Sequence, residues 1–223
     1  MKFTFSLLYI FISCSSFGQN ESDNTFNEKG FSVYTVYDSH ILTWAHCAYK
    51  PTIGYRINYL KAKEKSIINF GIGYDLFKPK ADTLYYLIGS NAYGQVAYSN
   101  FTAIPAYFGI TKSLSKNNIP LKLEYGIDLG ILFYGYSFNA VERGRTFSPT
   151  TIEGLGNICP RAGIKYELNK SLSINWRTGI HLLFTFLGGD KEAINFATAQ
   201  KQSITFFSLF SSGIGISYVF NKQ

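Results

Sequence analysis

Apolar and polar side chains alternate with a period of two along most of the chain, and residues 121–133 show this pattern most clearly. Their odd-numbered positions are apolar or aromatic throughout, whereas their even-numbered positions are mainly charged residues and glycines. Because successive side chains of a strand point to opposite faces, this segment predicts a strand with one apolar and one polar face. It exceeds the usual soluble strand of about 5–6 residues and is long enough to cross a bilayer, which takes about 9–11 tilted residues.

Other segments repeat the two-faced pattern, at 49–59, 68–76, 101–111, 158–167, 171–184 and 204–220. A first strand is expected near 30–38, where β-forming residues are frequent but the two faces are not cleanly different. Segment 101–111 contains Pro105, which argues against a regular central strand unless a bulge absorbs it.

The connections between these segments alternate between short turns and long loops. Short turns fall at 61–65, 113–118 and 169–170, and long loops at 79–95, 137–156 and 188–202. Bacterial outer-membrane barrels combine short periplasmic turns, longer external loops and an even strand number. We therefore expect an all-β fold, a transmembrane antiparallel up-and-down β-barrel of about eight strands with both termini in the periplasm.

Composition agrees with a membrane barrel more than with a soluble domain. Charged residues make up 16% of the chain, against roughly 25% in ordinary soluble domains, and aromatic residues reach 17%. No apolar run long enough for a transmembrane helix follows the N-terminal segment, so the membrane signal lies in the alternation. The formal charge is +7, but the basic residues are scattered, which argues against a nucleic-acid partner.

The N-terminal segment 1–18 is typical of a secretory signal peptide. Lys2 supplies the positive start, residues 3–12 the apolar core, and Ser16 and Gly18 the small positions of a cleavage site. In an alternative interpretation, the segment is a lipoprotein signal and Cys14 is lipidated. Under either interpretation the protein is exported from the cytoplasm. Residues 19–29 then form a polar periplasmic lead-in, and residues 30–223 form the barrel.

The chain resembles the small, porin-like outer-membrane β-barrels of the OmpA, OmpX and OmpW type. The resemblance rests on the signal segment followed by two-faced strands, on the alternating connections, and on the ending 213–220 with its aromatic residues Tyr218 and Phe220. It implies location in the outer membrane of a Gram-negative bacterium, contact with outer-membrane lipid, and recognition of Tyr218 and Phe220 by the barrel-assembly machinery. The chain departs from the pattern by adding residues 221–223 after the last aromatic.

A secreted, soluble lipocalin-like barrel is the alternative fold, because it shows the same alternation turned inside out. Glycine recurs on the polar face, at Gly54, Gly71, Gly73, Gly126, Gly130, Gly163, Gly179, Gly213 and Gly215. Glycine weakens an exposed strand face but makes room for long side chains inside a narrow barrel. The polar face is therefore expected to line the lumen.

A lumen of about eight strands is just wide enough for side chains to fill. The inward-facing polar set is Arg56, Asp75, Lys122, Glu124, Asp128, Arg161, Lys165, Glu167, Arg177 and His181. Unpaired buried charges are costly, so these groups are expected to pair and plug the lumen. The alternative is a narrow pore for small solutes.

No arrangement typical of a catalytic, cofactor or metal site is found, so the chain is not expected to be an enzyme. A lipid-modifying barrel enzyme remains a weaker alternative, with His181 as the histidine concerned. His40 and His46, assigned to the first external loop with Cys47, match no strong metal motif. A disulfide between Cys47 and Cys159 would suit the compartment, but the two residues take opposite parities.

These patterns favour a structural or surface-interaction role. The three long loops, with Tyr85, Tyr86, Tyr93, Arg143 and Arg145, are where a surface ligand would bind.

Overall fold

The computed structural model describes residues 27–41, 48–63, 66–88, 92–114, 119–142, 145–148, 150–184, 191–195, 200–204 and 206–220. The signal peptide predicted at 1–18 lies outside the described residues. Of the predicted lead-in 19–29, only the last three residues are described, and they already belong to the first strand.

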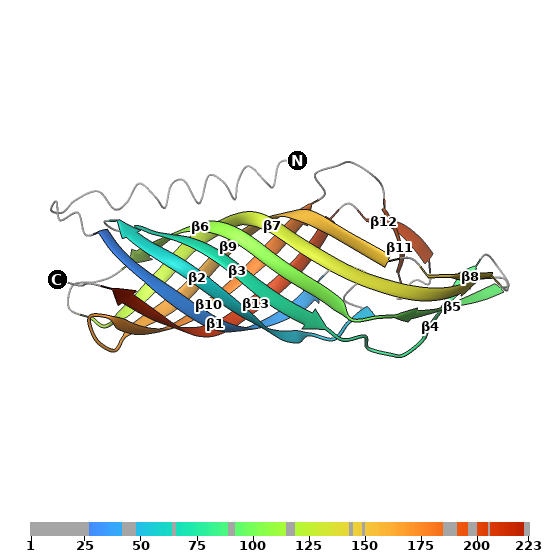
Figure 1. Cartoon of the computed structure of the whole chain (residues 1–223), viewed down its shortest axis with the longest axis horizontal. Helices are drawn as coiled ribbons and strands as arrows, with labels where there is room; N and C mark the ends of the chain where they lie inside the picture. Colours follow the sequence, from blue (N-terminus) through green and yellow to red (C-terminus); the bar gives the residue numbers. More distant parts are fainter. Residues whose placement is uncertain are drawn as a thin grey trace.

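Eight strands form the wall of a closed barrel, in the order β1, β2, β3, β6, β7, β9, β10 and β13 (Figure 1). Their bounds are β1 Asn27–Ile41, β2 Thr52–Lys63, β3 Ser66–Phe77, β6 Phe101–Leu114, β7 Leu121–Glu142, β9 Thr150–Glu167, β10 Leu172–Phe184 and β13 Phe206–Phe220. The first and last strands close the barrel, because β1 pairs antiparallel with β13 from Lys29↔Phe220 to Ile41↔Ser208. The predicted eight-stranded antiparallel barrel is therefore confirmed.

The two ends of the barrel differ. At one end, the turn end, β1 begins and β13 ends, and the strand-to-strand connections are short (Figure 1, left). One of these turns is stabilised by the side chain of Asn169, whose Oδ1 accepts hydrogen bonds from the backbone N–H groups of Ser171 and Leu172 at 2.9 and 2.8 Å.

The other end, the loop end, carries additional strands in place of irregular loops. They are β4 Leu84–Ile88, β5 Ala92–Tyr98, β8 Arg145–Phe147, β11 Lys191–Asn195 and β12 Gln200–Ile204. β5 and β8 pair with the distal half of β7, and β4 pairs with β5, so the sheet extends well past the barrel wall (Figure 1, right). β11 and β12 form a separate hairpin. The described residues of the segments 79–95, 137–156 and 188–202 are thus largely β-structure, which the sequence pattern had not indicated.

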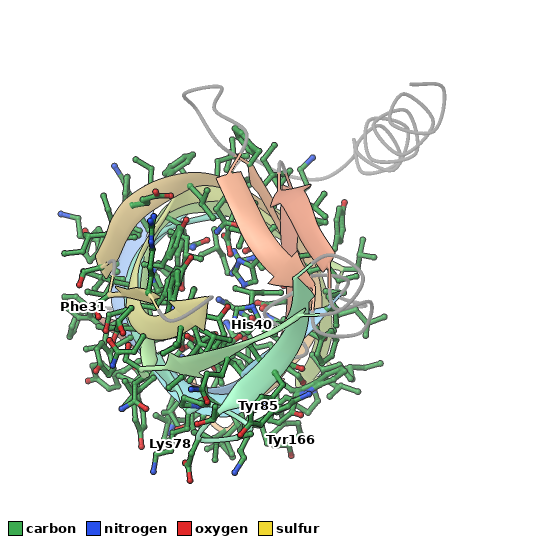
Figure 2. All side chains as sticks on the ribbon, turned by 90° about the vertical axis from the view of Figure 1, so that its right-hand side faces the viewer. Phe31, His40, Lys78, Tyr85 and Tyr166 are labelled. Atoms are coloured by element: carbon green, nitrogen blue, oxygen red, sulfur yellow. The ribbon has the colours of Figure 1, made fainter. Side chains whose placement is uncertain are left out.

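The outer surface of the barrel is a belt of exposed apolar side chains. It includes Val33, Ile53, Tyr55, Ile57, Phe70, Ile72, Leu123, Leu129, Trp176, Ile214 and Ile216. Ile53 and Ile214 are each 63% exposed. Phe31 and Tyr166 also point outward, whereas His40 lies within the ring of strands (Figure 2). A closed wall that leaves no backbone edge and presents apolar side chains outward is what a bilayer requires, so the barrel is transmembrane. The lipocalin-like alternative would need polar side chains on the outer surface and apolar side chains inside the barrel.

Among the described residues, no helix has the length and apolar character needed to span a membrane.

Pro105 sits in β6 without a bulge. The register of β6 with β7 is continuous through Pro105↔Leu132. On the other side, the ladder with β3 passes from Ile72↔Ala106 to Asp75↔Ala103 with no pair at Pro105. Because proline has no N–H to donate, a local gap in one ladder is enough to accommodate it.

The lumen glycines lie where long side chains cross the barrel. A Cβ at Gly71 would overlap the ring of Tyr107, and a Cβ at Gly54 would overlap the carboxylate of Asp75. Tyr107 uses this room to donate a hydrogen bond from its hydroxyl to Asn58 Oδ1 at 2.6 Å. Glycine on this face therefore provides space for the polar network of the lumen.

Candidate functional site

The lumen contains a buried cluster of one guanidinium and two carboxylates. Arg56 on β2 donates from Nη1 and Nη2 to the two carboxylate oxygens of Asp75 on β3, at 2.6 and 2.8 Å. Its Nη2 also donates to Asp38 on β1 at 2.6 Å. The side chains are 7% exposed for Arg56 and 1% for each carboxylate. Ser211 on β13 donates a further hydrogen bond to Asp38, so four strands meet at this cluster.

A second buried cluster surrounds Arg161 on β9. Its Nη2 lies 3.2 Å from Asp128 Oδ1 and donates to Asn69 Oδ1 at 2.6 Å and to the hydroxyl of Thr111. Asn69 in turn donates to Asp128 at 3.3 Å. Strands β3, β6, β7 and β9 are thereby linked across the lumen.

Arg177 on β10 is more loosely paired. Its Nη2 lies 3.5 Å from Glu124 Oε2, at the outer limit of a hydrogen bond. Its guanidinium carbon sits 4.7 Å from the ring centroid of Tyr34, which is a cation–π distance.

A third ionic group lies nearer the turn end. Glu167 accepts a hydrogen bond from Lys122 at 2.8 Å and lies 3.3 Å from Lys165. These side chains are 15–25% exposed, so this end of the lumen is wetter than the middle.

All ten residues of the predicted lumen set lie on the inward face of their strands, and each has a polar partner in the lumen. Sequence reasoning missed Asp38, because the two faces of its strand were not cleanly different. The predicted set held five basic residues (Arg56, Lys122, Arg161, Lys165, Arg177) and four acidic ones (Asp75, Glu124, Asp128, Glu167), and Asp38 makes the count five against five. The excess of one basic residue in the predicted set could have indicated that an acidic residue, Asp38, was still missing from it.

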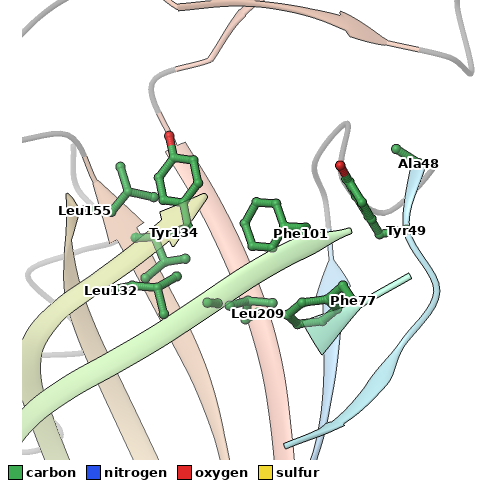
Figure 3. Packing of buried hydrophobic residues seen from close by; sticks show 10 residues of the cluster. Ala48, Tyr49, Phe77, Phe101, Leu132, Tyr134, Leu155 and Leu209 are labelled. Carbon is green, nitrogen blue, oxygen red and sulfur yellow. The ribbon is translucent and has the colours of Figure 1, made fainter. Parts of the chain in front are cut away.

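A cluster of apolar and aromatic side chains, here called the plug, lies toward the loop end of the barrel. It contains Ala48, Tyr49, Phe77, Phe101, Ala103, Leu132, Tyr134, Leu155, Leu183 and Leu209 (Figure 3). Phe101 lies between Tyr134 on one side and Tyr49 and Phe77 on the other (Figure 3). Its ring stacks on Tyr134 with centroids 5.4 Å apart and meets Phe77 edge-on at 5.7 Å.

Two residues of this plug region correct sequence expectations. Tyr49 was expected to begin the two-faced strand 49–59, with its side chain on the apolar, lipid-facing side, but it precedes β2 and is only 2% exposed. His40 was assigned to an external loop, but it lies in β1 with its ring 4.5 Å from Phe77 and 5.2 Å from Phe101. Burial raises the pKa of the Tyr49 phenol, and Tyr98 and Tyr136 raise it further, so Tyr49 stays neutral.

Aromatic rings continue from the plug along the inner face of the extended β7. Tyr134 and Tyr136 stack at 6.2 Å, and Tyr136 and Phe138 at 6.3 Å. The hydroxyl of Tyr134 donates to Glu153 on β9 at 2.5 Å. The plug is thus continuous with the extension at the loop end.

The described residues hold no group of three or more His, Cys, Asp or Glu side chains arranged to bind a metal ion. His181 is buried in the lumen, with Nδ1 3.1 Å from Asn157 Oδ1. Cys159 is a buried free thiol facing the lumen. His46, Cys47 and Arg143 lie outside the described residues, so the structure does not test a disulfide between Cys47 and Cys159.

A cavity of about 60 Å³ remains among the charged clusters of the lumen. Its wall includes Arg56, Asp128, Arg161, Arg177 and His181. Pockets for drug-sized ligands enclose roughly 300–1,000 Å³, so this cavity is suited only to water or a very small ligand.

Tyr218 and Phe220, predicted to carry the assembly signal, point outward at the turn end and are 50% and 41% exposed. Phe220 packs edge-on against Phe31 with ring centroids 5.6 Å apart, and Phe31 meets Tyr59 at 5.5 Å. These rings form an aromatic group on the outer face of β13, β1 and β2, as expected of part of an interfacial girdle in a transmembrane barrel.

The fold is that of a small outer-membrane-type β-barrel. The even strand number, the closed antiparallel wall and the apolar belt carry this conclusion, and the resemblance expected from the sequence is confirmed at the level of the fold.

Comparison with known proteins yields similar structures but no similar sequences. No family model and no curated protein matches the sequence. Neisserial surface protein A is 8% identical, with a TM-score of 0.46 over 88% of this chain and 99% of its own. A major outer membrane protein from Thermus thermophilus is 13% identical, with a TM-score of 0.46 over 86% and 99%. The attachment invasion locus protein Ail of Yersinia pestis is 10% identical, with a TM-score of 0.43 over 87% and 99%.

Proposed function

We propose that this protein is a closed barrel in the outer membrane of a Gram-negative bacterium, and that it acts through the structured extension at its loop end. The single observation that carries the proposal is the double closure of the lumen. Paired charges occupy the middle of the barrel, and the apolar plug around Phe101 occupies the lumen toward the loop end. A barrel closed in this way provides a rigid base rather than a passage.

The extension supports a surface-interaction role. β7 and β9 continue beyond the plug, and β4, β5 and β8 widen this part into a sheet. It exposes Tyr85 (68%) and Ile152 (81%), together with Arg145. Exposed aromatic and arginine side chains on a rigid support are common where protein surfaces bind partners.

Two further partners belong to this proposal. Outer-membrane lipid contacts the apolar belt, and the barrel-assembly machinery recognises Tyr218 and Phe220 at the end of β13. The orientation follows the usual arrangement, in which the turn end faces the periplasm and the loop end faces outward. No catalytic residue, cofactor or nucleic-acid partner is assigned.

Location and orientation can be tested together. Membranes are fractionated, and boiled and unboiled samples are compared by gel electrophoresis. We expect an outer-membrane band that shifts on heating, because a closed barrel has every backbone group paired and resists detergent until heated. An epitope inserted between Ile88 and Ala92 should bind antibody on intact cells, whereas an epitope after Gln223 should bind only after permeabilisation. A soluble protein with no heat shift would contradict the proposal.

The role of the extension is tested by replacing residues 84–96 with a short glycine and serine turn. The heat shift should persist, because the barrel wall is intact, whereas surface binding to a panel of extracellular proteins and glycans should be lost. Equal binding by the wild type and the replacement variant would contradict a role of the extension in binding.

A narrow pore is the second candidate, and the cavity together with the partly exposed turn-end cluster favours it. Planar-bilayer recordings separate the two functions. The closed barrel predicts no large, stable channels from the wild type, whereas a pore predicts reproducible unitary conductance that changes with Arg177→Ala.

A further inference from the structure

The cavity in the middle of the lumen has an unusually basic wall. Three guanidinium groups line it, from Arg56, Arg161 and Arg177, and one carboxylate, from Asp128. The carboxylates that pair with Arg56 and Arg177, namely Asp38, Asp75 and Glu124, do not contribute to the wall. The cavity is therefore lined by the arginines of these ion pairs and not by their carboxylates.

Donors in this wall lack acceptors. The Nε–H groups of Arg161 and Arg177 are buried and have no hydrogen-bond acceptor within the described part of the chain. The Arg161 side chain is only 7% exposed. Buried donors in proteins are almost always satisfied by protein groups, water or a ligand, so these two point to an occupant that accepts hydrogen bonds.

Arg177 is the group with most capacity for another partner. Its nearest carboxylate oxygen is 3.5 Å away, whereas Arg56 has carboxylate oxygens at 2.6 Å on two sides. Charge-assisted hydrogen bonds normally measure about 2.7–2.9 Å, so the contact with Glu124 is a weak hydrogen bond, although the two charges remain paired.

The volume restricts the class of ligand. A cavity of about 60 Å³ exceeds the roughly 10–15 Å³ that one water molecule needs, and it can hold a few waters or one monatomic ion with water. It is too small for an organic solute.

The route to the cavity is also basic. The plug residues at the loop end are buried and apolar, whereas Lys122, Lys165 and Glu167 at the turn end are partly exposed. With two lysines and one glutamate, this cluster has a net charge of 2 − 1 = +1. A small anion entering from the turn end would first meet this positively charged cluster.

We propose that the lumen cavity binds a small inorganic anion of the halide class between the guanidinium groups of Arg161 and Arg177. The bound anion bridges β9 and β10 where their hydrogen-bonded ladder is interrupted at a proline. No residue pair is formed there between Gly179↔Arg161 and Leu182↔Ile158. The anion is a structural ligand of the closed lumen.

The direct test is diffraction from crystals of the full chain grown in bromide, with data collected at the bromine absorption edge. We expect an anomalous peak in the cavity within hydrogen-bond distance of Arg161 or Arg177. A cavity that contains water only, with no anomalous peak, would overturn the proposal.

A solution test uses detergent-solubilised barrel in bromide or gluconate at equal ionic strength. Ligand binding to the folded state stabilises it, so bromide should raise the unfolding midpoint of the wild type by about 2–4 °C. Arg177→Gln should abolish this shift. Lys78→Gln removes the same charge from the outer surface, where Lys78 is exposed and points away from the barrel (Figure 2), and should retain it.

If Arg177→Gln does not fold, Arg177→Lys retains the charge but loses the Nε donor, and it should reduce the shift. Equal shifts in the wild type, both variants and the surface control would indicate a general salt effect and contradict the proposal.

Discussion

Arg56 and Asp75 form a two-fold hydrogen-bonded pair across neighbouring strands, with Nη1–Oδ1 and Nη2–Oδ2 distances of 2.6 and 2.8 Å. Asp38 approaches the same guanidinium from the opposite neighbouring strand at 2.6 Å. One arginine therefore compensates two buried carboxylates, and its loss leaves both without a counter-charge.

Replacing Arg56 with methionine should destabilise the barrel strongly. Removing one partner of a buried ion pair typically costs about 3–5 kcal/mol, because the remaining charge stays buried. Urea unfolding in micelles, followed by tryptophan fluorescence, measures the effect. The triple variant Arg56→Met, Asp38→Asn, Asp75→Asn removes the charges together and should recover much of the loss. A single variant as stable as the wild type would contradict the role assigned to this cluster.

Replacing the plug residue Phe101 should destabilise the barrel more than replacing an aromatic residue of the lipid-facing belt. Phe101 is 2% exposed at the centre of the plug, so Phe101→Ala leaves a cavity and should cost about 3–5 kcal/mol of unfolding free energy. It should also permit brief channel openings in planar bilayers. Phe70→Ala is the matched control, because Phe70 is 53% exposed on the outer face. Its variant should stay closed, and channels of equal size in both variants would contradict the plug.

The space at Gly71 should be required for the lumen network. Gly71→Ala places a methyl group against Asn58 Oδ1 and the ring of Tyr107, and overpacking of this kind costs about 1–3 kcal/mol. The double variant Gly71→Ala, Tyr107→Leu should regain part of that stability. Gly154→Ala is the control, because a Cβ there meets its nearest atom, on Ile131, at 3.4 Å, an ordinary contact. Urea midpoints that fall equally for Gly71→Ala and Gly154→Ala would show that glycine flexibility, not space, is responsible.

Phe220→Ala should reduce assembly in cells more than refolding in micelles. If the terminal aromatic is read by the assembly machinery, its loss should lower the heat-shifted fraction in outer membranes severalfold, whereas refolding of the purified chain loses only girdle contacts with Phe31 and Tyr218. Ile214→Ala changes an exposed apolar residue on the same face of the same strand and serves as the control. Equal losses in cells and in micelles would indicate a purely structural role for Phe220.

The period of two was sufficient to predict which side chains of most strands face inward. The strand around Glu124 and Asp128 alternates without interruption and the strand around Arg177 and His181 alternates except at Thr178, and the structure places all four charged or histidine side chains in the lumen. This works because each side-chain direction in a strand is set by the backbone next to it and not by distant contacts.

The tertiary structure alone decided which groups meet. Arg56 could have paired with several acids of the lumen, and the register of β1, β2 and β3 selects Asp38 and Asp75. Barrel closure likewise brings His40, Tyr49 and Phe101 into one plug, although none of them showed this by its sequence neighbours. Alternation along a strand determines a face, whereas partners across a lumen depend on the register and closure of eight strands at once.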